Sequence, residues 1–216
     1  MGCDIHAYAE IKRSYGNEEV AWYCCETFQL NPYYFYKKNK GESVEGEAMY
    51  IHSPLYFGRN YALFEALAGV RGEMENCIFD FKGHIPDDCS GFIRSEYEQW
   101  QADAHSPSYI TLKELVEADG MGPYKCSGYF NKADADLIDK GKGNIKMDSR
   151  PILIAEQGFT EYREFDVEVD ILKKFKDVFI ASFKSEKYLD YCSDERVLEE
   201  IKISGDDYRI IFWFDN

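Results

Sequence analysis

Two polar residues near the start of the chain have the types and the spacing needed for chemistry. Asp4 and His6 alternate with Cys3 and Ile5 in a segment whose pattern predicts a β-strand. Because alternate residues of a strand share a face, Asp4 and His6 are expected to point the same way, roughly 6–7 Å apart. That separation suits a shared metal ion, phosphate group or proton.

An acidic residue follows an apolar run near the other end of the sequence. Residues 208–215 are strongly apolar and prone to β structure, which predicts a central strand. If this strand pairs with the first one, Asp215 approaches Asp4 and His6. Carboxylates and imidazoles bind divalent metals, so these three residues are the predicted metal ligands. The sequence assigns no cofactor, and a divalent metal stays an open alternative.

A second group of polar residues surrounds His105. His105, Ser106 and Ser108 precede a capping box that runs from Thr111 to Glu114. A loop before a helix offers backbone N–H groups to an anion, and hydroxyl groups bind phosphate. His105 suits an acid/base or ligand role. The alternative is turn chemistry, with His105 merely exposed.

Three further residues are candidates for contact with an anionic ligand. Arg59 offers a planar guanidinium for phosphate or carboxylate. Asn60 either contacts the ligand or caps a helix, and Asp88 either binds the ligand or a metal or caps the next helix. The predicted ligand-binding residues are therefore Arg59, Asn60, His6, Asp4, His105, Ser106, Ser108 and Asp88.

The order of apolar patterns predicts an α+β fold in a single domain that spans residues 1–216. We expect a mixed, mostly antiparallel sheet, with the N- and C-terminal strands near each other and helices packed on it. Strands are predicted at 2–11, 19–30 and 208–215, and helices at 60–70, 91–100 and 166–183. Polar, glycine-containing stretches predict loop excursions near 31–50 and 120–150.

Composition restricts the partners and the location. The net charge of −15 repels nucleic-acid polymers and anionic membranes, although a small anionic ligand is compatible with a local pocket. No signal peptide or membrane-spanning stretch is recognisable, and the seven cysteines form no paired motif. We therefore expect a cytoplasmic protein with reduced thiols, and a homo-oligomer remains open.

The usual catalytic motifs are missing from the sequence. It contains no Walker A loop, no G-x-S-x-G elbow and no H-E-x-x-H pair. A nucleophile formed by Cys3 and His6 is disfavoured, because strand alternation places the two side chains on opposite faces.

Five short blocks occur in order along nearly the whole chain. They are Met1-Gly2-Cys3-Asp4-Ile5-His6, Gly58-Arg59-Asn60-Tyr61 with the later Leu67-Ala68-Gly69-Val70-Arg71, Pro86-x-Asp88-x-Ser90, His105-Ser106-x-Ser108, and Phe212-x-Phe214-Asp215-Asn216. In these blocks the chain resembles a family of small, largely uncharacterised proteins of bacteriophages and prophages. It departs from that family at His84, where an arginine is typical, and in extra residues within 31–50 and 120–150.

The resemblance implies a role in the cytoplasm of an infected host cell. Small phage proteins with polar pockets often counter host defences, including those that signal through nucleotides. We therefore expect a protein that binds and sequesters a small, phosphate-bearing, nucleotide-like signal. Arg59 would contact the phosphate, and Tyr or Trp side chains would stack on the base.

Two other functions stay open at this level. One is a metal-assisted hydrolase of phosphoesters or nucleotides, in which Asp4 and His6 hold the metal or the reacting water and His105 is the general acid/base. The other is a structural protein, or one that contacts a host protein.

Overall fold

A computed structural model describes residues 2–14, 16, 19–25, 28–118, 124–130, 132–139, 161–167 and 170–215. The chain forms two compact units. The first unit consists of Met1–Asp119 and Leu172–Asn216, and the second of Gly120–Ile171. The sequence predicted one domain, whereas its 120–150 excursion falls in this second unit.

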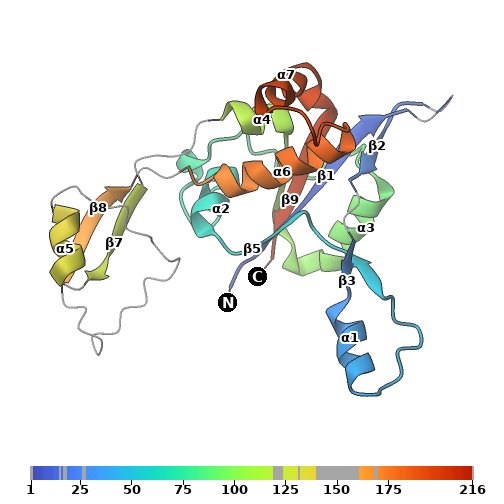
Figure 1. Cartoon of the computed structure of the whole chain (residues 1–216), viewed down its shortest axis with the longest axis horizontal. Coiled ribbons are helices and arrows are strands. Elements are labelled where there is room, and N and C mark those ends of the chain that lie inside the picture. Colours follow the sequence, from blue (N-terminus) through green and yellow to red (C-terminus); the bar gives the residue numbers. More distant parts are fainter. Residues whose placement is uncertain are drawn as a thin grey trace. The chain divides into compact units, whose positions relative to one another are not determined.

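The first unit is built on a five-stranded antiparallel sheet, coloured from blue to red in Figure 1. Its strands are β1 (Ile5–Arg13), β2 (Ala21–Cys24), β5 (Tyr56–Gly58), β6 (His105–Thr111) and β9 (Tyr208–Phe214). The order is β2–β1–β9–β6, and β5 pairs with the first residues of β1. Helices and an antiparallel sheet confirm the predicted α+β fold.

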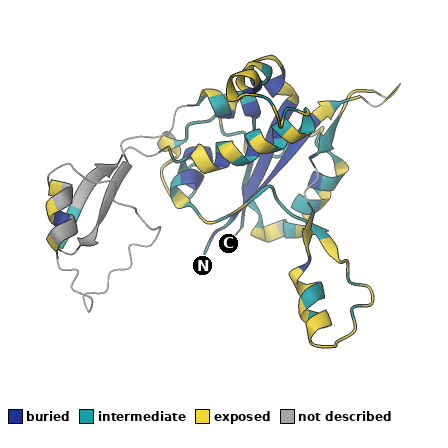
Figure 2. Ribbon diagram, viewed as in Figure 1, coloured by how far each residue is buried: buried dark blue, intermediate teal, exposed yellow. Residues whose placement is uncertain are grey.

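The two strands nearest the chain ends are neighbours in the centre of the sheet. β1 pairs with β9 from Ile5 opposite Phe214 to Ile11 opposite Tyr208. All seven residues of β9, and the first seven of β1, are buried, as Figure 2 shows in dark blue. The predicted pairing of the terminal strands is thus confirmed, and its apolar side chains form much of the core.

Helices cover both faces of this sheet. On one face, α3 (Gly91–Trp100) places Ile93 against Tyr8 and Trp213. On the other, α2 (Tyr61–Ala68) and α6 (Lys173–Glu186) bring Phe64 to Phe214 and Phe183 to Tyr208, in edge-to-face ring contacts. The first unit also contains the helices α4 (Leu112–Glu117) and α7 (Asp194–Ser204) and the short η1 (Met74–Asn76), η2 (Gln101–Asp103) and η4 (Gly205–Asp207).

Local capping signals in the sequence fix several helix ends. The Asn60 side chain accepts a hydrogen bond from the Leu63 N–H (3.2 Å), which starts α2, and Gly69 ends it in the left-handed conformation (φ 64°). The capping box between Thr111 and Glu114 is present in full at the start of α4. Both predictions are confirmed, as are the bounds of α3.

Other predicted elements are wrong. Residues 19–30 contain two strands, β2 and β3 (Phe28–Leu30), and the predicted loop at 31–50 contains α1 (Pro32–Asn39) before β4 (Tyr50–His52). The helix predicted from Asp166 begins only at Lys173, because Asp166 belongs to β8 (Glu161–Val167). The 120–150 stretch contains β7 (Tyr124–Phe130), which pairs with β8, and α5 (Lys132–Asp139).

None of the helices in the described ranges has the length and apolar character needed to cross a bilayer.

Candidate functional site

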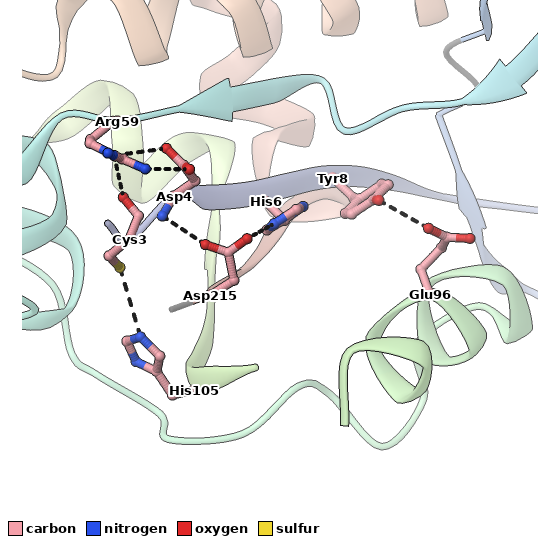
Figure 3. Close-up of polar contacts among 8 residues, drawn as sticks. All are labelled: Cys3, Asp4, His6, Tyr8, Arg59, Glu96, His105 and Asp215. Carbon is pink, nitrogen blue, oxygen red and sulfur yellow. Dashed lines mark hydrogen bonds and ion pairs between the residues drawn. The ribbon is translucent and has the colours of Figure 1, made fainter. Parts of the chain in front are cut away.

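Four polar residues, the chain-end cluster, meet where β1 begins and β9 ends (Figure 3). They are Asp4, His6, Arg59 and Asp215. One Asp215 oxygen accepts a hydrogen bond from the Asp4 N–H (2.8 Å), and the other lies 3.0 Å from His6 Nε2. The Asp4 carboxylate contacts the Arg59 guanidinium through both oxygens (2.8 and 3.2 Å). The predicted approach of Asp215 to Asp4 and His6 is confirmed.

Strand register explains why these residues meet. His6 lies opposite Trp213, and Asp215 is two residues farther along, on the same face as Trp213. The backbone N–H of Asp215 donates to the Asp4 carbonyl (3.0 Å), which extends the ladder beyond the last regular pair. The cluster is therefore fixed by the backbone pairing of the two chain ends.

Arg59 is held from several sides. Its Nε donates to the Cys3 carbonyl (3.2 Å) as well as to Asp4. A Cβ atom added to Gly2 would overlap the Arg59 guanidinium, so a larger residue at position 2 would require the guanidinium to shift. Hydrogen bonds with Asp4 raise the pKa of Arg59, although about half of its side chain (51%) stays exposed. The result is a fixed cation that solvent can reach.

His6 is enclosed by aromatic rings. Trp100, Phe57 and Trp213 have ring centroids 4.2, 5.0 and 5.9 Å from the imidazole, which is almost fully buried. Phe57 lies opposite His6 in the register of β5 with β1, so both side chains share a face. Yet 58% of Phe57 is exposed. The exposed ring of Phe57 therefore lies on the side of the sheet that carries Asp4 and Arg59.

Farther along the same face, Tyr8 donates a hydrogen bond to Glu96 of α3 (3.2 Å), as Figure 3 shows. Burial, reinforced by the Glu96 charge, raises the pKa of the Tyr8 hydroxyl. This pair anchors α3 and stays outside the chain-end cluster.

A thiol and an imidazole meet beside the cluster. Cys3 Sγ lies 3.7 Å from His105 Nε2, and His105 Nδ1 lies 3.1 Å from the Ser106 hydroxyl. The Cys3 side chain is fully buried, and this burial raises its thiol pKa despite the lowering effect of Arg71. The thiol is therefore mostly protonated at neutral pH, which disfavours it as a nucleophile.

His105 does not lie in a loop as predicted, because it is the first residue of β6 and pairs opposite Phe214. A β-bulge follows between His105 and Ser108, and Ser106 has a positive φ of 49°. Its pairing with Phe214 places His105 at the same end of the sheet as the chain-end cluster, in contact with Cys3.

Three predicted binding residues have structural partners instead. Asn60 caps α2, which was the alternative reading of that residue. Ser108 is buried, and its hydroxyl accepts a hydrogen bond from the Lys82 N–H (3.0 Å). Asp88 lies near the Glu10 end of β1, roughly 20 Å along the strand from Asp4, so it does not join the cluster.

Asp88 belongs to a polar network at that far end. Arg209 pairs with buried Glu10 through Nε and Nη2 (2.9 and 2.8 Å) and donates from Nη1 to Asp88 (2.7 Å). The Trp22 ring stacks on the Arg209 guanidinium at 3.9 Å and its Nε1–H donates to Asp88 (3.0 Å). Partial burial opposes ionisation of Asp88, but the hydrogen bonds from Arg209 and Trp22 lower its pKa.

The chain-end cluster gives no support to the predicted metal site. Within the described residues, no group of three His, Cys, Asp or Glu side chains is arranged to hold a metal ion. The oxygens of Asp4 already contact Arg59, and those of Asp215 contact Asp4 and His6. A second cation at this position would compete with Arg59 for the same carboxylate.

Three residues near the cluster were not predicted as site residues. Phe57 has a usable sequence signal, because it stands two positions before Arg59 and would share its face in a strand. The contact of Cys3 with His105 lies at the irregular start of β6, where Pro107 is a local sequence signal for a bulge. Arg71 reaches Cys3 from a left-handed turn (φ 62°), a conformation unusual for arginine.

The cysteines are consistent with reduced thiols. The six whose side chains the structure describes form no disulfide: Cys3, Cys24, Cys25, Cys77, Cys89 and Cys192.

Comparisons of this chain with protein-family models, with curated proteins and with solved structures found no match.

Proposed function

We propose that this protein binds and sequesters a small, phosphate-bearing, nucleotide-like molecule at the chain-end cluster. The observation that carries the proposal is the Arg59 guanidinium, which is fixed by Asp4 and the Cys3 carbonyl but half exposed. A pre-positioned guanidinium binds phosphate with little loss of side-chain entropy. In a chain of net charge −15, such a cation also favours a small anion over a long nucleic-acid polymer.

The ligand's second feature is a planar ring. Phe57 offers an exposed aromatic face two residues before Arg59, and its ring is braced by the enclosed His6. Side chains at positions i and i+2 of an extended chain are separated by roughly 6–7 Å. A nucleotide that stacks its base on Phe57 places its phosphate toward Arg59.

Sequestration is favoured over turnover by the chemistry of the neighbouring groups. The Cys3 thiol is buried with a raised pKa, and the carboxylates of Asp4 and Asp215 are engaged in hydrogen bonds. The resemblance to phage proteins adds the nucleotide signals of host defence as the ligand class. The protein would then act in the host cytoplasm by lowering the concentration of free signal.

The test is a binding experiment with recovery of the ligand. The protein is mixed with linear and cyclic mono- and dinucleotides, separated from free ligand, and heated, and the released compounds are identified by mass spectrometry. We expect one class to be retained and recovered intact. Recovery of an altered compound would support the hydrolase alternative, with His105 as the acid/base, and retention of none would contradict the proposal.

A matched pair of variants locates the site. Arg59→Met should weaken binding by about tenfold or more, since a hydrogen bond to a charged group contributes about 1.5–3 kcal/mol. Arg196→Met on α7 removes an arginine of similar exposure (54%) and should leave the affinity unchanged. Equal losses in the two variants would show that the effect is only one of net charge.

A further inference from the structure

A projecting segment of the first unit carries an exposed apolar surface. This arm consists of residues 28–52, which form β3, α1 and β4. β3 and β4 make a separate two-stranded sheet, and α1 contains no buried residue. Figure 1 shows α1 standing away from the helices that cover the main sheet. Docking against its own core therefore does not explain why this helix forms.

Local interactions build the arm instead. The Asn31 side chain accepts a hydrogen bond from the Tyr33 N–H (3.0 Å) and donates to the Ala48 carbonyl (2.9 Å), which ties the start of α1 to the returning chain. Pro32 follows this cap at the first helical position. Lys37 pairs with Glu47 (2.7 Å) across the loop. Interactions within the arm itself therefore hold its conformation.

The outward surface of the arm is rich in large apolar side chains. Leu30 and Tyr50 are opposed in the β3–β4 register, and both are about half exposed. Tyr33 and Tyr36 of α1 are exposed to 54% and 53%. Met49, which precedes Tyr50 in sequence, is also exposed. Proteins that remain monomeric rarely maintain such a surface, and tyrosine and methionine are enriched in protein interfaces.

The charges on α1 define the partner's chemistry. Lys37 lies over the Tyr33 ring (4.5 Å) and Lys40 over the Tyr36 ring (4.4 Å), while Pro32–Asn39 contains no acidic residue. The arm therefore presents ammonium groups directly beside aromatic rings. A complementary surface must combine carboxylates with apolar side chains.

The same chain carries a surface of that kind, here called the α7 patch. In the turn before α7, Tyr188 and Tyr191 are almost fully exposed (90% and 104%), and Leu198 is exposed on the helix itself. Acidic residues lie among them in sequence: Asp190, Asp194, Glu195 and Glu199. Glu195, Leu198 and Glu199 follow helical i, i+3, i+4 spacing, so they share one face of α7.

We propose that the arm of one molecule docks on the α7 patch of a second copy of this chain. Tyr33 and Tyr36 would pack against Tyr188, Tyr191 and Leu198, and the ammonium group of Lys40 would face the carboxylates of α7. The two surfaces are different, so the contact is heterologous and needs one arm and one patch. It is independent of ligand binding at the chain-end cluster.

Sedimentation velocity over a wide concentration range tests this association. The unmodified protein should form a dimer or larger species as its concentration rises. A double substitution in the arm, Tyr33→Ser with Tyr36→Ser, should raise the dissociation constant by about tenfold or more, as expected for loss of interface anchors. So should a patch variant, Leu198→Ser with Glu199→Lys. Val20→Ser, which removes an exposed apolar side chain elsewhere (60%), should leave the dissociation constant unchanged.

Mixing the two variants gives the decisive result. An intact patch on the arm variant and an intact arm on the patch variant can still form one contact, so the mixture should associate more strongly than either variant alone. Unchanged circular dichroism and thermal unfolding establish that the variants fold. A monomer at every concentration, association that survives the arm variant, or a mixture that associates no better than its components would each overturn the proposal.

Discussion

At the scale of single residues, Asp215 holds the two ends of the chain together. Its carboxylate accepts a hydrogen bond from the Asp4 backbone and contacts the buried His6 ring. In Asp215→Ala both partners lose this group where water has little access, so we expect the free energy of unfolding to fall by about 2–3 kcal/mol. Urea denaturation followed by tryptophan fluorescence measures the change.

A surface carboxylate provides the control for this effect. Asp206 pairs with Lys113 at 3.3 Å, and its side chain is mostly exposed. Asp206→Ala should therefore cost less than about 1 kcal/mol. If Asp215→Ala cost no more than Asp206→Ala, the contacts of Asp215 would contribute little to holding the chain ends.

Part of the chain-end cluster follows from sequence and part does not. Strand alternation and two apolar terminal strands suffice to bring Asp4, His6 and Asp215 together, because the period of a strand fixes which side chains share a face. Ser108 and Asp88 have the right residue types for binding, but their partners Lys82 and Arg209 are distant in sequence. Residue type alone cannot separate a ligand contact from such a structural hydrogen bond.

At the scale of elements, one ion pair joins three parts of the fold. Glu10 of β1 and Arg209 of β9 are directly opposed, and the second Glu10 oxygen accepts a hydrogen bond from the Ser90 N–H before α3 (2.6 Å). Removing Arg209 leaves the charge of Glu10 buried without this cation. Arg209→Met should thus lower the free energy of unfolding by about 3–5 kcal/mol, measured by chemical denaturation.

Replacing both partners distinguishes a buried charge from lost packing. The double variant Glu10→Gln with Arg209→Met removes both charges, so it should be more stable than Arg209→Met alone. A double variant that is no more stable than Arg209→Met would mean that the buried Glu10 charge is not the cause, and that the loss comes from the missing contact of Arg209 with Trp22.

Helix starts were predictable where the chain carries a local capping signal. Asn60 and the Thr111–Glu114 capping box act within a single turn, so the sequence defines where α2 and α4 begin, whereas the predicted end of the first of these helices at residue 70 lies past Gly69, which ends α2. Between Asp166 and Lys173 there is no comparable signal, and alternating apolar and charged residues fit a strand as well as a helix. The pairing of β8 with β7, in a separate unit, decides that case.

At the scale of the whole molecule, the core contains weak acids that must stay neutral. Burial raises the pKa of Cys25, Tyr8 and Tyr208 far above the ordinary values of 9.0 for a thiol and 10.0 for a phenol. In the unfolded chain these groups ionise near their ordinary values. Their neutral forms therefore contribute stability that is complete below about pH 9 and is lost progressively at higher pH.

Alkaline unfolding of the intact chain tests this coupling between burial and pH. Urea denaturation from about pH 8 to about pH 11 should show a falling free energy of unfolding, by about 1.4 kcal/mol per pH unit for each such group above its unfolded pKa. Cys25→Ala removes one titrating group and should give a shallower slope. Val197→Ala also weakens buried packing but removes no acid, so it should keep the slope of the unmodified protein. Parallel slopes in all three proteins would mean that the growing net charge of this acidic chain, rather than ionisation of the buried thiol, drives the loss.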